Sequence, residues 1–337
     1  EMLRSLVGSE MCIRDSYILE RFFGEYTKEE YLSLEEDKFQ KIVCAYLAEY
    51  AVKYFGEEQL ESNSFTYRLK TILDNVMYLM KHIMEELSQS EFFVADCELK
   101  IGEDIPSYTI VLPDGHKIAV CGSVDRVDIM QRADITYLRI IDYKTGTKQF
   151  KLSDILYGIN LQMLLYLHSI EASGGDKYGE IVPAGILYMP ATVPYISSDS
   201  LKSIDKLPDE LNKKLKMNGL LLKDTEIIHG MDKTDVATYI PVKIKAGEPV
   251  SSTSLATLAE FGKIFKKVDM LIAEMGKNIY NGNIEAKPLK GGHDSCEYCP
   301  YDSVCAYRQS NPITCFSVDN KTVIEEITNE INGKEEE

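Results

Sequence analysis

This chain has fewer basic than acidic residues, with 37 lysines and arginines against 54 aspartates and glutamates and a formal net charge of −17. A free-standing, high-affinity nucleic-acid binder normally has a basic surface, so the charge balance argues against that class of protein. The same balance leaves open an enzyme that receives nucleic acid from a partner protein.

Two further absences narrow the class of protein. No apolar run approaches the length of a membrane span, and the first residues lack the basic, apolar and small-residue order of a secretion signal. The phosphate-binding pattern G-x-x-x-x-G-K-[ST] is also missing, because "KTGTK" does not have its spacing. We therefore predict a cytoplasmic protein without membrane contact, and the sequence argues against ATP hydrolysis by this chain.

Eight cysteines in 337 residues, with no sign of secretion, do not indicate a disulfide framework. Three of them, Cys296, Cys299 and Cys305, are clustered in "CEYCPYDSVC". Thiolates at this density bind zinc or an iron–sulfur cluster. The spacing alone favours zinc, because many zinc sites begin with a two-residue gap between cysteines.

Hydrophobic periodicity divides the chain into segments. The early segments repeat apolar residues at three and four positions, as helices do, and the later ones have the alternating character of strands. The order of helices, three or four strands, a helix and a strand predicts an α/β fold. We predict a spurious leader at 1–16, helices at 17–93, a core at 94–193, an insertion at 194–254, a helix and cysteine-rich segment at 255–315, and an acidic tail at 316–337. The last part of this tail, "ITNEINGKEEE", is expected to fray.

Two neighbouring strands of the predicted core each carry an aspartate near one end. If "VCGSVDRVDIM" and "TYLRIIDYKTG" form an antiparallel hairpin with its turn near Arg132 to Asp134, Asp125 lies opposite Asp142. Alternation of side chains then places Lys144 on the same face as Asp142 and turns Asp128 to the other face.

This arrangement predicts a metal site. Two carboxylates that face each other in a partly dry site repel, and Mg²⁺ or Mn²⁺ removes the conflict because oxygen ligands suit these ions. Lys144 beside them can orient a water molecule or stabilise charge on a phosphate, which is the chemistry of metal-assisted phosphodiester hydrolysis. The alternative is a solvated hairpin end, in which such Asp–Lys pairs contribute about 0–1 kcal/mol.

The segment "SDILYGINLQMLLYLHSIEAS" predicts one helix with Ser153 as its N-cap, apolar nearly all round and therefore buried. Gln162 and Tyr166 are four residues apart, so they share a face of this helix. A buried glutamine needs hydrogen-bond partners and a tyrosine hydroxyl offers one, so the alternative to a functional pair is a satisfied core pair.

Taken together, "GSVDRVD", "IIDYKTG" and "LQMLLYL" resemble the RecB-like branch of the PD-(D/E)XK nucleases. The segments "PAGILYMPA", "KMNGLLLKDTEIIHGMD" and "CEYCPYDSVC" extend the resemblance to the C-terminal nuclease region of the AddB-type subunits of bacterial helicase–nucleases. The resemblance covers about residues 17 to 315. It implies an α/β, restriction-endonuclease-like PD-(D/E)XK core with a central mixed sheet, flanking helices and a C-terminal iron–sulfur staple.

The resemblance also implies roles for individual residues. Asp125 and Asp142 would bind Mg²⁺ (or Mn²⁺) with the backbone carbonyl of Tyr143, and Lys144 would position the attacking water. The pair at 162 and 166 would be the Gln-x-x-x-Tyr motif, which contacts DNA or orders the site. Glu98, in "CELKIG", is more simply a strand-edge charge than a metal ligand.

For the cysteines, the resemblance implies that Cys296, Cys299 and Cys305 bind a [4Fe–4S] cluster whose fourth ligand lies upstream. Cys12 precedes Ile and Arg and does not match that ligand, whereas Cys315 is near enough to replace it. We therefore predict an incomplete or labile cluster. The family's upstream histidine would precede Tyr17, where this sequence has no histidine.

The implied function is that of a Mg²⁺-dependent DNA exonuclease domain, which hydrolyses phosphodiesters at DNA ends in double-strand-break repair by homologous recombination. Its partners would be DNA and a helicase–nuclease subunit of the AddA type. A stand-alone Cas4-type iron–sulfur exonuclease shares the Asp, Asp-x-Lys and Gln-x-x-x-Tyr signals, but the chain length and "KMNGLLLKDTEIIHGMD" disfavour it. A non-catalytic, cluster-stabilised DNA-threading scaffold is the third possibility, and it has no need of the two aspartates and the lysine together.

Overall fold

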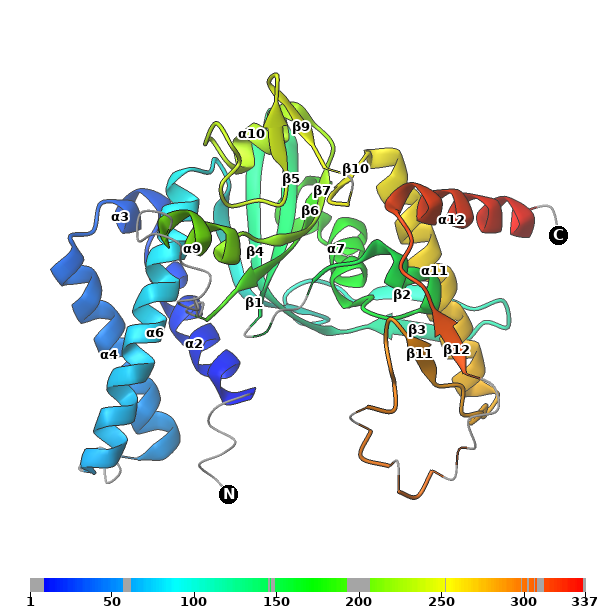
Figure 1. Cartoon of the computed structure of the whole chain (residues 1–337), viewed down its shortest axis with the longest axis horizontal. Helices are drawn as coiled ribbons and strands as arrows, with labels where there is room; N and C mark the ends of the chain where they lie inside the picture. The colour runs from blue at the N-terminus through cyan, green and yellow to red at the C-terminus, as the bar shows by residue number, and fades with distance from the viewer. Residues whose placement is uncertain are drawn as a thin grey trace.

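The centre of the protein is a six-stranded mixed sheet (Figure 1). The computed structural model describes residues 9–56, 62–144, 146, 149–192, 207–251, 253–297, 299–301, 303–305, 307 and 312–335. The strands follow the order β1 (Phe93–Ile101), β4 (Gly122–Arg132), β5 (Ile135–Lys144), β6 (Glu180–Pro190), β7 (Asn218–Leu222) and β10 (Leu255–Ala256). The pairs β5–β6 and β7–β10 are parallel and the other pairs are antiparallel, so the predicted α/β fold with a central mixed sheet is confirmed.

Helices gather on two sides of this sheet (Figure 1). The N-terminal group consists of α2 (Ser9–Glu25), α3 (Lys28–Leu32), α4 (Glu36–Phe55) and α6 (Asn63–Ser88). The group on the other side consists of α7 (Gln162–Ser173), α11 (Leu258–Tyr280) and α12 (Asn320–Glu335). The predicted helical character is thus observed for the described residues from 17 to 88, and α2 runs without a break across the predicted end of the leader at residue 16. Among the described residues, no helix is long and apolar enough to cross a membrane.

The β4–β5 hairpin has the predicted register. Arg126 pairs with Ile141 and Arg132 with Ile135, so the strands turn over two residues only. Ala133, the first of them, has φ 48, which is the left-handed conformation that tight hairpin turns require. Because strand side chains alternate, this register fixes which residues of the two strands share a face.

The segment predicted as one helix from Ser153 is broken. Leu152–Tyr157 forms a 3₁₀ helix, η1, which ends at Gly158 with φ 68, and α7 begins only at Gln162. Ser153 therefore lies inside η1 and is not an N-cap. The left-handed backbone at Gly158 ends the first helix because glycine adopts it without steric cost.

Residues 194–254 are not simply an insertion. Their described part contains α9 (Leu207–Leu215), α10 (Thr225–Met231), β8 (Lys243–Lys245), β9 (Glu248–Val250) and also β7, which belongs to the central sheet. Gly219 of β7 lies so close to β6 that an added Cβ would meet the Ile186 carbonyl oxygen at 2.0 Å. The prediction of an insertion is wrong for β7, because this strand belongs to the central sheet. All its residues after Asn218, which are one glycine and three leucines, are buried.

The C-terminal residues are ordered as well. After the short parallel pair β11 (Leu289–Gly291) and β12 (Ile313–Cys315), helix α12 buries Val323, Ile327 and Ile331 and packs against α11. The Lys267 ammonium of α11 lies 2.5 Å from the Glu330 carboxylate of α12. The tail is acidic as predicted, but the expectation that it is frayed is wrong for the described residues.

The remaining elements are the hairpin β2 (Tyr108–Val111) and β3 (Lys117–Val120), and α8 (Gly175–Tyr178).

Candidate active site

The predicted acidic pair lies where β4 begins and β5 ends, at one end of two antiparallel neighbours. The backbone N–H of Tyr143 donates a hydrogen bond of 3.0 Å to Asp125 Oδ2. The Lys144 ammonium lies 2.5 Å from Asp142 Oδ2, and Asp142 is only 7% exposed. The structure therefore brings together Asp125, Asp142 and Lys144, as the hairpin register predicts.

The electrostatics of the pair are those of two crowded carboxylates. Burial, and then repulsion from Asp142, raise the pKa of Asp125 to about 7. Glu98 raises this pKa further, while the Tyr143 N–H and the Lys144 ammonium oppose the rise. Near neutral pH, Asp125 is therefore divided between its protonated and charged forms, and a nearby cation would favour the charged form.

Glu98 is closer to this pair than its sequence context suggests. Its neighbours Cys97 and Leu99 on β1 pair with Arg126 and Val124, which flank Asp125 on β4. The Ser123 hydroxyl donates a hydrogen bond of 2.8 Å to Glu98 Oε2. Glu98 does lie on an edge strand, as predicted, but its φ of 52 is rare outside glycine and marks a strained position.

Gln162 and Tyr166 lie on the first turns of α7. The Gln162 side chain is exposed, so the alternative of a buried core pair does not apply to it, and its Nε2 donates to the Tyr166 hydroxyl at 3.4 Å. That hydroxyl occupies the space of a side chain at Gly122, because an added Cβ there would lie 2.2 Å from it. The sequence analysis did not predict Gly122 as a site residue. The available signal was a glycine within a strand, which often marks a place where another group approaches the backbone closely.

The donor set suits a hard divalent cation. Within the described part of the chain, Asp142 Oδ2 is buried and accepts no hydrogen bond, so its contact with Lys144 is an ion pair without hydrogen-bond geometry. Asp125 adds a second carboxylate held at a raised pKa. Over the described ranges there is no group of three or more His, Cys, Asp or Glu side chains arranged to hold a metal ion. Two carboxylates nevertheless match Mg²⁺, which completes its shell with water, backbone carbonyls and substrate phosphate.

The three clustered cysteines lie between β11 and β12. Cys296 and Cys299 are half-buried, Cys305 is exposed, and all three are free thiols. The Cys299 N–H donates to the Cys296 carbonyl at 3.3 Å, which closes a turn. Among the residues that the structure describes, these thiols are not arranged as a ligand set, and the iron–sulfur cluster stays a prediction. Cys315 is buried at the end of β12, and the side chain of Cys12 lies outside the described residues.

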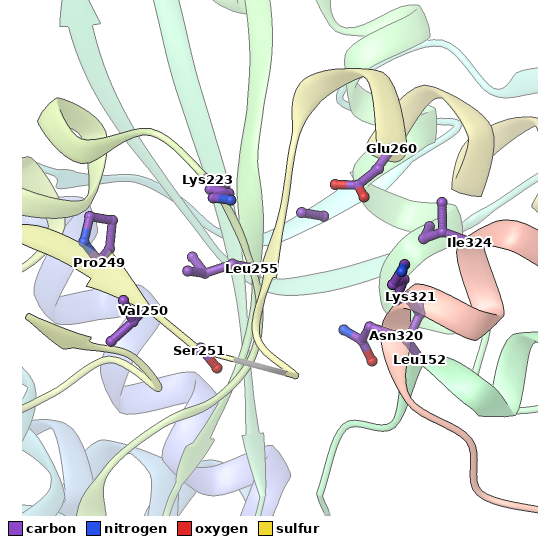
Figure 2. A pocket seen from close by; sticks show the side chains of 11 residues that line it. Leu152, Lys223, Pro249, Val250, Ser251, Leu255, Glu260, Asn320, Lys321 and Ile324 are labelled. Carbon is purple, nitrogen blue, oxygen red and sulfur yellow. The ribbon is translucent and has the colours of Figure 1, made fainter.

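A separate cavity of about 290 Å³ opens between β9, β10 and the start of α12 (Figure 2). Lys223, Glu260 and Lys321 contribute its charged groups, and Leu255 and Ile324 its apolar ones. None of the predicted site residues lines it, so the acidic pair and this cavity are distinct features of the protein.

A mixed sheet whose adjacent strands bring Asp and Asp-x-Lys together, with a Gln-x-x-x-Tyr helix beside them, defines a nuclease of the PD-(D/E)XK type. The family model described as the PD-(D/E)XK nuclease superfamily matches residues 17–306, and the chain belongs to this superfamily.

The chain is similar to proteins named as the B-type subunit of an ATP-dependent helicase/deoxyribonuclease. It is 38% identical over 246 residues to the protein of Thermoanaerobacter sp. (strain X514), a match that covers 71% of this chain and 21% of the relative. It is 36% identical over 275 residues to that of Alkaliphilus oremlandii, covering 78% and 24%. It is 33% identical over 305 residues to that of Alkaliphilus metalliredigens, covering 87% and 26%. The chain therefore spans about a quarter of the length of these relatives or less.

Proposed function

We propose that this chain is the Mg²⁺- or Mn²⁺-dependent deoxyribonuclease domain of a helicase–nuclease of this kind, an exonuclease that hydrolyses phosphodiesters at DNA ends. The observation that carries the proposal is the meeting of Asp125, Asp142 and Lys144 at one end of two paired strands, in a chain that belongs to a nuclease superfamily. The names of the relatives support DNA as the substrate.

Each residue has a distinct role in this proposal. Asp125 and Asp142, with the backbone carbonyl of Tyr143, would hold the cation, which supplies stabilisation of charge on the phosphate. The Lys144 ammonium beside Asp142 would orient the attacking water or stabilise the developing negative charge. Gln162 is exposed at the first turn of α7, where its amide can reach a DNA strand while Tyr166 holds it in place.

We also propose the finer features that the resemblance implies. The protein would act in the cytoplasm beside a partner of the AddA type, in double-strand-break repair by homologous recombination. The net charge of −17 is consistent with a partner that holds most of the DNA. Cys296, Cys299 and Cys305 would bind an incomplete or labile [4Fe–4S] cluster, and anaerobic reconstitution followed by iron counting tests this: a stable four-iron stoichiometry with Cys12 and Cys315 both mutated refutes it.

Cleavage of single-stranded DNA with Mg²⁺ tests the catalytic proposal. Asp142→Asn removes one charged ligand at nearly constant volume, and we expect the rate to fall by at least about 10²-fold, as on removal of a group that stabilises developing charge. Asp134→Asn is the matched control, because Asp134 lies exposed in the hairpin turn at the other end of the same two strands. Equal rates in the wild type and Asp142→Asn would leave only the non-catalytic scaffold.

A further inference from the structure

Four charged side chains are completely buried behind the acidic pair. Arg126 and Arg139 bring two positive charges, and Glu86 and Asp128 bring two negative ones, with no exposed surface on any of them. Arg126 lies 2.8 Å from Asp128 and 3.1 Å from Glu86, and Arg139 lies 2.9 Å and 2.6 Å from the same two carboxylates. The group, here termed the rear cluster, joins α6, which carries Glu86, to β4 and β5.

The rear cluster is formally neutral, but its burial is costly. A buried ion pair is often no more stabilising than apolar residues of the same volume, so stability alone is a weak reason for four buried charges. Its position suggests another reason. Arg126 follows Asp125 in β4 and Tyr143 follows Asp142 in β5, and alternation puts Arg126 and Tyr143 on the face opposite the two carboxylates.

Tyr143 connects the two faces of the sheet. On the front, its backbone N–H donates to Asp125 Oδ2 at 3.0 Å. On the rear, its hydroxyl accepts a hydrogen bond of 3.3 Å from Arg126, whose guanidinium also lies 5.9 Å from the centre of the tyrosine ring. Because Tyr143 stands between Asp142 and Lys144 in the chain, a shift of its ring also moves the peptide that carries both site residues.

The two arginines differ in their second neighbour. Both are fully buried and both pair with Glu86 and Asp128, but Arg126 donates to the Tyr143 hydroxyl, whereas Arg139 lies against the ring of Phe92, 4.9 Å from its centre. The rear cluster therefore holds one arginine that contacts Tyr143 and one that packs elsewhere. This difference separates a positioning role from a purely structural one.

We propose that Arg126 is a positioning residue that, through Tyr143, fixes the spacing of the two site carboxylates and thereby their affinity for a divalent cation. The proposal rests on the proposed metal-dependent function. It assigns the rear cluster the task of holding Arg126 rigid, since the carboxylates of both Glu86 and Asp128 accept hydrogen bonds from its guanidinium.

Direct titration with Mn²⁺ in the absence of DNA, followed by electron paramagnetic resonance, tests the proposal without using activity. The wild type should show a site that Asp142→Asn abolishes. Removing a group that orients a metal ligand typically weakens binding 10- to 100-fold, so we expect about tenfold weaker binding in Arg126→Lys and Tyr143→Phe.

Arg139→Lys and Tyr31→Phe are the matched controls for these two variants and should retain the wild-type affinity. Arg139 shares the carboxylate partners of Arg126. Tyr31 is a buried tyrosine near the same cluster, and its hydroxyl has no hydrogen-bond partner among the described residues.

Each outcome of the Mn²⁺ titration supports or overturns either the positioning role of Arg126 or the proposed function. Wild-type affinity in Tyr143→Phe, or equal weakening in Arg126→Lys and Arg139→Lys, overturns the positioning role while the Asp142-dependent site remains. Absence of any site that Asp142→Asn abolishes overturns the proposed function itself, and the positioning role with it. If Arg126→Lys does not fold, the pair Tyr143→Phe and Tyr31→Phe alone decides, since each loses only one hydroxyl.

Discussion

The ammonium of Lys144 lies 2.5 Å from Asp142 Oδ2. The second carboxylate of the site, Asp125, forms no such ion pair among the described residues. The lysine therefore pairs with Asp142, while burial and then repulsion from Asp142 raise the pKa of Asp125 to about 7. If Asp125 and Asp142 hold a divalent cation, as proposed, the Lys144 ammonium would be held less tightly by Asp142 and could orient water or stabilise charge on the substrate.

This relationship predicts that Lys144→Met separates catalysis from metal binding. The variant keeps most of the side-chain length and removes the charge, so cleavage of single-stranded DNA should fall by about 10²-fold or more, as for other groups that stabilise transition-state charge. Mn²⁺ affinity should stay the same or rise, because the competing ammonium is gone. Loss of Mn²⁺ binding in this variant would show instead that Lys144 builds the metal site.

The raised pKa of Asp125 predicts a pH dependence of stability in metal-free protein. In the unfolded chain an aspartate titrates near pH 4, and in the folded protein burial and Asp142 raise this pKa to about 7. The folded state thus binds the extra proton between these values, and the contribution of Asp125 to stability is present below about pH 4 and lost as the pH rises through about 7.

Urea unfolding of the wild type and Asp125→Asn, both with a chelator, measures this contribution. At pH 7.5 we expect the variant to be more stable by on the order of 2–4 kcal/mol, and the difference to shrink toward pH 4. Added Mg²⁺ should stabilise the wild type and leave Asp125→Asn unchanged. A stability difference that does not vary with pH would contradict the electrostatic origin of the effect.

The hairpin and its carboxylates could be predicted because they depend on local rules. The turn at Ala133 and Asp134 sets the register, and the period of two along a strand then places Asp125 with Asp142 and turns Asp128 away. The remaining parts of the site depend on residues that are distant in the chain. Glu98 comes beside Asp125 only because β1 pairs with β4 in one register, and no local pattern encodes that register.

The errors in the fold have equally specific causes. The break before α7 depends on Gly158 and on Asn160, which both have positive φ, inside a segment whose apolar residues otherwise suit one helix. β7 is five residues long, and the periodicity of so short an apolar run does not distinguish a strand from a segment of buried helix. For α12 the signal was present, because Val323, Ile327 and Ile331 repeat at helical spacing, but the many glutamates around them favoured a solvated tail.

Gly122→Ala should disturb the Gln-x-x-x-Tyr motif without touching a charge. The new methyl group would fall 2.2 Å from the Tyr166 hydroxyl and 2.6 Å from the ring carbon that bears it, so the ring must move away from β4. We expect a loss of about 1–3 kcal/mol in the free energy of unfolding, typical of overpacking. Cleavage should fall as well, because Gln162 loses its hydrogen-bond partner.

Gly262→Ala is the control for this substitution. Gly262 lies exposed in α11, and no heavy atom of the described residues comes within 4 Å of an added Cβ. Alanine should therefore raise stability by about 0.5–1 kcal/mol and leave cleavage unchanged. Wild-type cleavage in Gly122→Ala, despite the expected loss of stability, would mean that the position of Tyr166 is irrelevant to the reaction.

His168 provides the last prediction, on the face of α7 that packs against α11. Burial acts to lower its pKa, but hydrogen bonds to Asp269 and Glu171, each at 3.2 Å, outweigh burial and raise the pKa to about 9. The ring also stacks on Phe265 at 4.6 Å between centroids. The charged imidazolium therefore joins the two helices, and its contribution to stability is complete below about pH 6.5 and lost as the pH rises through about 9.

His168→Gln should accordingly destabilise the protein by on the order of 1–3 kcal/mol at pH 6 and by much less at pH 10. The measurement is urea unfolding of both proteins at the two pH values, with His116→Gln as the control because His116 is exposed in the β2–β3 turn. A destabilisation of equal size at both pH values would mean that the ring acts through its packing on Phe265 and not through its charge. The stabilisation by His168 is larger at low pH, whereas carboxylates whose pKa is lowered by ion pairs, such as Glu91 beside Arg132, stabilise the fold more at high pH. One pH titration of stability therefore separates the contribution of the histidine from that of the carboxylates.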